Sequence, residues 1–283
     1  MKEDVNAKPS GTGNKLSIKK KFFRFLKLFI LIYCSIGIAV YYLQDKILFK
    51  PVQLPPAHKY AFKQPYEELD IPYAAGSNMN VIQFKTDSTP KGVVLYFHGN
   101  KKNIERYATA SENFTRNGYE VWMIDYPGFG KSTGDFTEQK IYDWALTFYR
   151  LARARFAPDS IVLYGKSLGT GFAAQLASVR DCKYLILETP YFSFPSVVGN
   201  YLPIYPVNTM IRFKMPVWQF LQHVTAPVVI FHGTSDWTIP IRNANRLKPY
   251  LKPGDQFIVL EGGKHNDLPE YENYHSTLDS LLN

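Results

Sequence analysis

The sequence predicts an α/β fold: a mostly parallel central sheet with helices on both faces, a short lid, and one N-terminal transmembrane helix before it. Short apolar runs alternate with helical patterns through most of the 283 residues, which is typical of parallel sheets. A long apolar stretch also lies close to the N-terminus, directly after a group of basic residues. That order is typical of a membrane anchor.

Residues 1–21 are predicted to form a basic tail. The first 27 residues contain eight Lys or Arg against two acidic residues, which accounts for six of the nine net positive charges of the chain. The remaining residues therefore carry little excess charge. The composition does not indicate a nucleic-acid-binding domain, and no nucleic-acid motif accompanies the tail.

Residues 22–43 are predicted to form the transmembrane anchor. The 16 residues from Leu28 to Leu43 are short for a span, but the apolar residues from Phe22 onward extend the stretch to 22. The basic residues before the apolar stretch predict that the N-terminus is in the cytoplasm and that the remaining domain is on the periplasmic, extracellular or lumenal side. A cleaved signal peptide is the alternative, since Gly37-Ile38-Ala39 is a small-x-small site.

Residues 45–283 are predicted to form a single domain that opens with an antiparallel hairpin. Its two segments, 69–73 and 79–86, flank Gly76-Ser77-Asn78. Strands and helices then alternate. The expected strands are 92–98, 119–125, 160–165, 183–188, 227–232 and 256–261, and the expected helices are 103–117, 137–156, 169–180, 241–251 and 268–282. A sheet of this type places its functional site at the carboxyl ends of the strands.

Residues 192–223 interrupt this alternation with a dense group of aromatic residues and prolines. One interpretation is a lid that forms an acyl or hydrophobic pocket. The alternative is one helix with proline-rich connections that packs over the sheet edge.

A candidate nucleophile follows the strand that ends at Tyr164. The sequence Gly165-Lys166-Ser167-Leu168-Gly169 leads into a small-residue helical stretch. This strand, G-x-S-x-G, helix order is that of a nucleophile elbow, in which glycines at 165 and 169 let the serine occupy a strained turn. Ser167 is the predicted catalytic serine, although a Gly-rich turn that only joins strand and helix has the same pattern.

Two later strand ends supply an acid and a base. Asp236 follows the strand at 227–232, and His265 follows the strand at 256–261. Serine, aspartate and histidine in this chain order match one known arrangement of the catalytic triad. Asp236 as a turn cap and His265 as an ordinary loop histidine remain alternatives, with Glu188 as the second candidate acid and His232 as the second candidate histidine.

An oxyanion hole is expected where the strand at 92–98 ends in His98-Gly99-Asn100. The predicted donors are the backbone amides of Asn100 and Leu168. His98 and Gly99 are expected to hold this loop in shape rather than to move protons.

These motifs, together with Asn103, the run Asp125–Ser132 and Gly233-Thr234-Ser235-Asp236, resemble the α/β-hydrolase superfamily. More narrowly, they resemble its membrane-anchored serine hydrolases with an H-G-N-x-x-N oxyanion loop, a group related to depalmitoylating acyl-protein thioesterases. The resemblance covers roughly residues 45–283 and implies the α/β-hydrolase fold. Lys101 and Lys102 depart from the small residues usual in relatives and would favour anionic substrates if they flank the site. The alternative is a charge pair in a loop that is only solvated.

The expected activity is hydrolysis of an ester or thioester through an acyl-enzyme, with a small-molecule acyl substrate, plausibly a lipid. A serine peptidase of aminopeptidase type and a non-catalytic interaction protein that retains the fold are the alternatives. No metal or cofactor is expected, because the Gly128–Ser132 run lacks the first glycine of a phosphate loop and neither Cys34 nor Cys182 has a ligand partner at metal spacing.

Overall fold

The computed structural model describes the backbone of residues 12–283 and the side chains of residues 18–283. It consists of two compact units that meet between Leu48 and Phe49, and each is described by itself. Residues 1–11 of the predicted basic tail lie outside the described residues. The predicted boundaries of tail, anchor and domain remain predictions.

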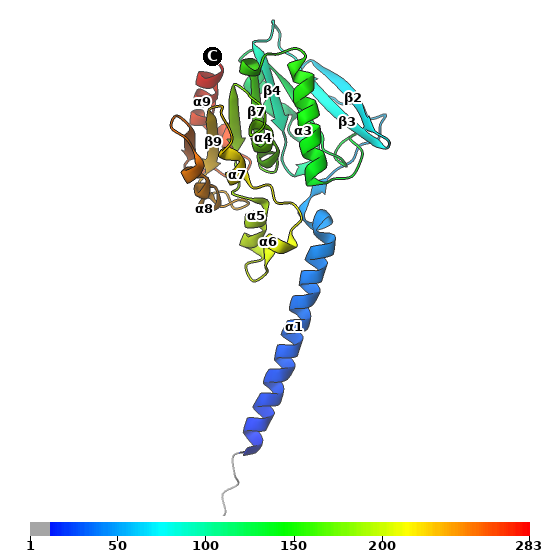
Figure 1. Ribbon diagram of the computed structural model, residues 1–283, viewed down its shortest axis with the longest axis vertical. Helices are drawn as coiled ribbons and strands as arrows, with labels where there is room; N and C mark the ends of the chain where they lie inside the picture. Colours follow the sequence, from blue (N-terminus) through cyan, green and yellow to red (C-terminus); the bar gives the residue numbers. More distant parts are fainter. Residues whose placement is uncertain (1–11) are drawn as a thin grey trace, which may run out of the picture. The chain divides into compact units, whose positions relative to one another are not determined.

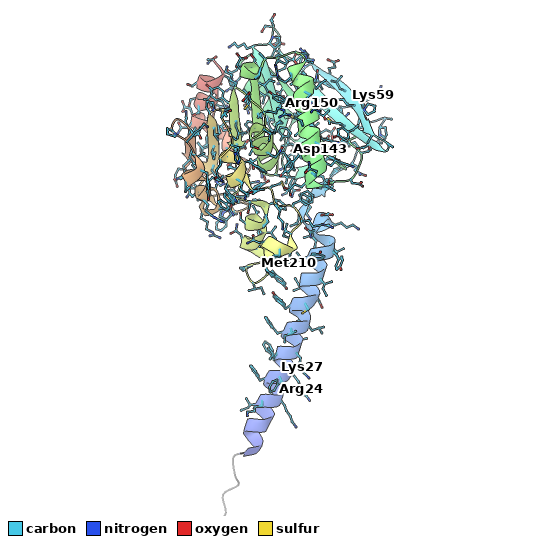
Figure 2. All side chains as sticks on the ribbon, in the orientation of Figure 1. Arg24, Lys27, Lys59, Asp143, Arg150 and Met210 are labelled. Carbon is cyan, nitrogen blue, oxygen red and sulfur yellow. The ribbon has the colours of Figure 1, made fainter. Side chains whose placement is uncertain are left out.

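The first unit contains a single continuous helix, α1 (Thr12–Leu48). Its segment Ile18–Leu48 has a mean hydropathy of 2.0 over an 18-residue window and is the one helix among the described residues that is long and apolar enough to cross a membrane. Thirty-one helical residues span about 46 Å, more than the ~30 Å of a hydrocarbon core. Arg24 and Lys27 project from this helix with their long side chains extended (Figure 2).

The second unit is built on an eight-stranded sheet in the order β10-β9-β8-β7-β4-β6-β3-β2. Only the β2–β3 and β3–β6 pairs are antiparallel, so the predicted α/β-hydrolase-type fold with a mostly parallel sheet is confirmed. The strands are β2 (Tyr66–Ala74), β3 (Ser77–Phe84), β4 (Gly92–Phe97), β6 (Tyr119–Ile124), β7 (Ile161–Lys166), β8 (Tyr184–Glu188), β9 (Val228–Gly233) and β10 (Gln256–Leu260).

Helices cover both faces of this sheet. On one face, Tyr96 of β4 and Tyr164 of β7 stack at 4.7 Å between ring centroids, in a buried cluster with side chains from α2 (Glu112–Thr115) and α9 (Glu272–Leu282). The next residue of β4, Phe97, points the other way and meets Phe148 of α3 (Glu138–Arg153). Figure 1 shows α3 beside α4 (Gly169–Ala177) in front of the strands. Apolar side chains on both faces explain why these strands are continuously hydrophobic.

Three expected helices are shorter or more irregular than predicted. The stretch 103–117 forms two 3₁₀ turns, Ile104–Arg106 and Ala108–Ser111, before α2. The stretch 241–251 divides into α8 (Ile241–Ala244) and a 3₁₀ helix that contains Pro249, and 268–282 starts as the 3₁₀ turn Leu268–Glu270 before α9. Proline has no amide hydrogen and its ring clashes with the preceding turn, so regular α-helix is interrupted at Pro249 and Pro269.

The hairpin and the insertion also differ in detail from expectation. The hairpin turn lies at Ala75 and Gly76, where Gly76 has φ 71°, and Ser77 already belongs to β3. The insertion at 192–223 forms three short helices instead of one: α5 (Phe194–Tyr201), α6 (Val207–Met210) and α7 (Val217–Leu221). Helix α7 packs on α4, so the insertion is folded onto the domain.

Candidate active site

Ser167 lies on the turn between β7 and α4 in a left-handed backbone conformation, with φ 51°. Such a conformation costs a residue with a Cβ about 1–2 kcal/mol. The flanking glycines make the turn possible: a Cβ at Gly165 would lie 2.6 Å from the Gly169 carbonyl oxygen, and one at Gly169 would lie 2.0 Å from that of Phe97. The turn is further fixed because the Ser167 amide donates to the Glu188 carbonyl at 2.9 Å.

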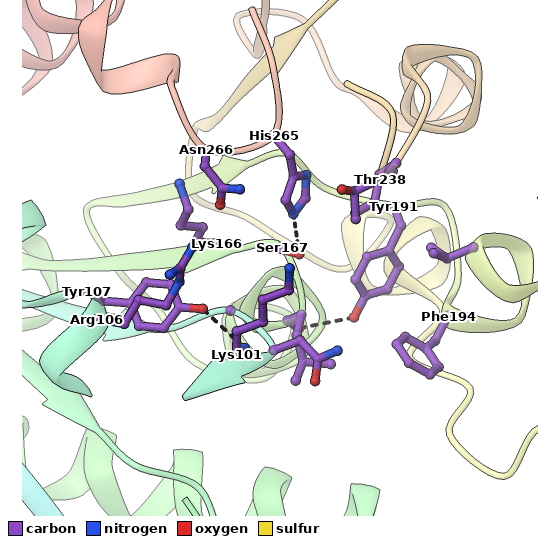
Figure 3. A pocket seen from close by; sticks show the side chains of 15 residues that line it. Lys101, Arg106, Tyr107, Lys166, Ser167, Tyr191, Phe194, Thr238, His265 and Asn266 are labelled. Atoms are coloured by element: carbon purple, nitrogen blue, oxygen red, sulfur yellow. Dashed lines mark hydrogen bonds between the residues drawn. The ribbon is translucent and has the colours of Figure 1, made fainter. Parts of the chain in front are cut away.

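The three predicted triad residues meet at the carboxyl end of the sheet. His265 Nε2 lies 3.0 Å from Ser167 Oγ, and His265 Nδ1 lies 2.7 Å from Asp236 Oδ2 (Figure 3). The other carboxylate oxygen of Asp236 accepts the amides of Thr238 and Ile239, each at 2.8 Å. The aspartate is buried and fixed by these bonds, so it can orient the imidazole and stabilise its charged form.

The two second-choice residues lie outside this chain of hydrogen bonds. Glu188 accepts bonds from Lys166 and Tyr164 in the protein interior, and no bond joins it to His265 among the described contacts. His232 has no exposed surface; its Nδ1 lies 3.0 Å from the Gly233 carbonyl and its Nε2 3.9 Å from Asp236. Burial lowers the pKa of His232, which favours its neutral form.

The predicted oxyanion residues lie beside the serine. Asn100 and Leu168 line the same cavity as Ser167. Leu168 immediately precedes Gly169, the first residue of α4, and amides at the start of a helix have no acceptor within it and favour negative charge. His98 is fully buried, with Nδ1 2.8 Å from the Gly99 carbonyl and Nε2 3.1 Å from Asp125. These contacts suit a residue that shapes the loop.

Asp125 supports the loop at 98–103, which contains the predicted oxyanion donor Asn100. No role for Asp125 was predicted from the sequence. Its carboxylate accepts the Ile104 amide at 3.0 Å and lies against His98. Burial raises the pKa of Asp125, while the hydrogen bond from His98 opposes that rise. Gly130 is required beside it, because a Cβ there would lie 1.9 Å from Asp125 Oδ2. The turn after β6 is therefore a structural support for this loop. The sequence feature that could have indicated this role is an aspartate directly after the end of a strand.

A second support is the segment of residues 49–54, which we call the strap. Its two-residue strand β1 (Lys50–Pro51) pairs in parallel with β5 (Lys101–Lys102). The Lys50 amide donates to the Asn100 carbonyl at 3.3 Å, and Asn103 Nδ2 donates to the Val52 carbonyl at 3.2 Å. The backbone of the oxyanion loop is thus held by the residues that directly follow α1 in the chain.

Phe49 links the strap to the insertion. Its side chain is 4% exposed and stacks with Phe194 at 5.5 Å between ring centroids, with Phe136 and Phe213 at 4.6 and 4.7 Å. Phe194 is also a wall of the cavity beside Ser167. One aromatic cluster therefore joins the strap, the insertion and the candidate site.

The cavity beside Ser167 has a volume of about 110 Å³. One side is apolar, with Tyr191 and Phe194, and the other carries Arg106, Tyr107 and Lys166 (Figure 3). Its lining comprises Gly99, Asn100, Lys101, Arg106, Tyr107, Lys166, Ser167, Leu168, Tyr191, Phe194, Val197, Thr238, Ile239, His265 and Asn266. None of these described lining residues is acidic. Among the described residues, no group of three or more His, Cys, Asp or Glu is placed to hold a metal ion.

Known hydrolases are similar to this chain in sequence. A family model described as serine aminopeptidase, S33, matches residues 88–206, and the α/β hydrolase domain-containing protein 17C of Xenopus tropicalis is 26% identical over 215 residues, 73% of this chain. The chain is therefore similar to proteins of the α/β-hydrolase superfamily. The aligned part covers 66% of the frog protein, slightly under two thirds of its length.

Solved structures share the fold of this chain. An esterase of Pyrococcus furiosus superposes with a TM-score of 0.63 and 16% identity, covering 83% of this chain and 97% of the esterase. The α/β hydrolase GrgF from Penicillium sp. sh18 gives a TM-score of 0.63 at 12% identity, covering 77% of this chain and 98% of that one. The family-model match includes Ser167 but ends before Asp236 and His265.

Replacing Gly169 with alanine is expected to destabilise the domain, because its Cβ would collide with backbone that has no room to move. The expected loss is about 1–3 kcal/mol, measured by urea unfolding of the detergent-solubilised chain with tryptophan fluorescence. Gly199→Ala in α5 is the control, since its Cβ would meet Val207 at an ordinary 3.4 Å. Equal unfolding midpoints for the two variants would contradict the close-packing account.

Phe49→Ala is expected to slow the reaction of Ser167 with a fluorophosphonate by at least about tenfold, because small displacements of an oxyanion loop are costly to catalysis. Phe156→Ala is the control, a partly buried aromatic whose ring contacts are with Trp122 and Arg155. Labelling rates are compared at a temperature where circular dichroism finds both variants folded. An unchanged rate in folded Phe49→Ala protein would show that the strap does not position the loop.

Proposed function

We propose that this chain is a membrane-anchored serine hydrolase that cleaves carboxylic ester or thioester bonds through an acyl-enzyme. The observation that carries the proposal is the continuous hydrogen-bonded order Ser167–His265–Asp236 on a strained elbow turn. A turn-capping aspartate and an ordinary loop histidine have no reason to meet a serine in this geometry. The similarity to α/β-hydrolase proteins and the esterase structures with the same fold support the same reaction class.

In the proposed reaction, Ser167 Oγ attacks the carbonyl carbon while His265 Nε2 accepts its proton. Asp236 stabilises the imidazolium, and the amides of Asn100 and Leu168 are the proposed donors to the oxyanion. His265 then protonates the departing alcohol or thiol, leaving the acyl group on Ser167. A water molecule, deprotonated by His265, attacks the acyl-enzyme and releases the carboxylic acid and the free serine.

The apolar wall of the cavity supports an acyl-chain or lipid-like substrate. Phe194 and Val197 reach it from the insertion at 192–223, which fits the proposed role of this segment as a lid. The resemblance to depalmitoylating acyl-protein thioesterases points in the same direction. Helix α1 supports attachment to a membrane, and the excess of lysine before it supports a cytoplasmic N-terminus with the hydrolase domain on the opposite side.

The description of the matching family model makes an aminopeptidase the second candidate. An aminopeptidase needs a negative group to hold the free amino terminus of its substrate. Three basic residues, Lys101, Arg106 and Lys166, and no acidic residue are among those described as lining the cavity. The positive charge of the cavity lining therefore favours an ester or thioester hydrolase over a peptidase. The third possibility, a non-catalytic interaction protein, gives no reason for the aligned triad.

Labelling with a fluorophosphonate probe tests for an activated serine. We expect the wild-type chain to be labelled and Ser167→Ala to be unlabelled, because the probe needs both the nucleophile and its base. Ser276→Ala is the matched control, since Ser276 is an exposed serine of α9 and should leave labelling intact. Folded wild-type protein that takes no label would favour the non-catalytic interaction protein.

Matched substrates separate ester or thioester hydrolysis from peptidase activity. The two substrates are an acetyl ester and an alanyl amide whose leaving groups share one chromogenic ring. Their rates of cleavage are compared at equal concentration. We expect the ester to be cleaved at least about a hundredfold faster, and we expect His265→Gln to slow that cleavage by at least about 10²-fold. His275→Gln is the control for a histidine outside the site. Faster cleavage of the aminoacyl amide would instead identify a peptidase.

A further inference from the structure

Two cationic side chains beside Ser167 have no acidic partner. Lys101 and Arg106 line the cavity and are exposed. No Asp or Glu side chain forms an ion pair with either of them within residues 18–283, the range whose side chains are described. Figure 3 shows the Lys101 side chain directed into the cavity toward Ser167.

The third basic residue of the cavity is already neutralised. Lys166 is buried and donates to the Glu188 carboxylate, which also accepts the Tyr164 hydroxyl. Of the other nearby acids, Glu105 binds His58 at 2.9 Å. Glu270 and Arg106 border one adjacent hollow, so the negative charge of Glu270 acts mainly on Arg106 and not on Lys101. The excess positive charge beside the serine therefore rests mainly on Lys101, with Arg106 next to it.

Lys102 shows that this placement is specific. It follows Lys101 in the same loop and is also exposed, but it does not line the cavity. Its φ of 64° turns the chain between the two lysines, and its carbonyl accepts the Val52 amide of the strap at 3.1 Å. The strap therefore holds the backbone so that only one of the two lysines reaches the site.

We propose that the substrate is an acyl ester or thioester whose leaving group carries a negatively charged phosphate, which Lys101 binds with the assistance of Arg106. This inference rests on the proposed function and names its substrate class. In this proposal the acyl group lies against Phe194, which is on the opposite side of Ser167 from Arg106 (Figure 3). Ammonium and guanidinium groups are the usual partners of phosphate oxygens in proteins.

The test uses two matched pairs of substrates with the full-length chain in neutral detergent micelles. The lipid pair is 1-oleoylglycerol and 1-oleoylglycerol 3-phosphate. The soluble pair is octanoyl-pantetheine and octanoyl-4′-phosphopantetheine. Each pair differs only in the phosphate, so the ratio of kcat/KM within a pair measures phosphate recognition, and the pair with the larger ratio identifies a lipid or a soluble source.

The expected ratio is at least about tenfold in favour of the phosphorylated member of one pair or both. Lys101→Met is expected to reduce that ratio by about fivefold or more, and Lys102→Met is expected to leave the ratio unchanged. The preference should also weaken as salt is raised from 0.05 to 0.5 M, since exposed charges are screened.

Three outcomes overturn the proposal. These are ratios near one in both pairs, equal effects of the Lys101 and Lys102 substitutions, and no turnover of any of the four substrates. Fluorophosphonate labelling of Ser167 in the same preparations separates this failure from failure of the proposed function. If Ser167 is labelled, only the phosphate inference is lost; if it is not labelled, the hydrolase proposal is lost as well.

Discussion

The left-handed turn at Ser167 is the constraint on which the site depends. A serine with φ 51° is unfavourable by itself, and it persists because β7, α4 and the end of β4 meet around it with glycines at 165 and 169. This packing lifts the side chain off the end of the sheet toward His265. The same crossing places Leu168 at the start of α4 beside the serine. Nucleophile and proposed oxyanion donor are therefore positioned by one backbone feature.

The opposite wall of the site is held by polar contacts that come from distant parts of the chain. Asp125 binds the Ile104 amide and faces His98, and the strap pairs with the oxyanion loop through β1 and β5. Phe49 adds an aromatic contact from the strap to Phe194. The segment that follows the apolar helix is consequently part of the candidate active site as well as a connection to it. Truncations that remove this segment would disturb the loop even in a folded domain.

The sequence was informative where a pattern extends over several residues. Buried parallel strands gave apolar runs with ends correct to about one residue, and the positions of Ser167, Asp236 and His265 after three of them placed all three at one edge of the sheet. Two-residue strands such as β1 and β5 have no periodicity, so the strap was not predicted. Pro249 and Pro269 broke helices that periodicity alone had extended. The pairing of Lys166 with Glu188 depends on strand register, which single-sequence patterns do not specify.

The candidate site combines a serine on a fixed turn with a cavity that is apolar on one side and cationic on the other. In the proposed reaction, Ser167 forms a covalent acyl intermediate. The most direct measurement is mass spectrometry of the chain quenched in acid during turnover of a short-chain ester and then digested. We expect the mass of the acyl group on the peptide that contains Ser167, and its loss after hydroxylamine treatment. An acyl adduct on any other residue would contradict the proposed reaction. Turnover without an adduct on Ser167 would also contradict it, provided that the ester is one whose acylation step is faster than its deacylation step.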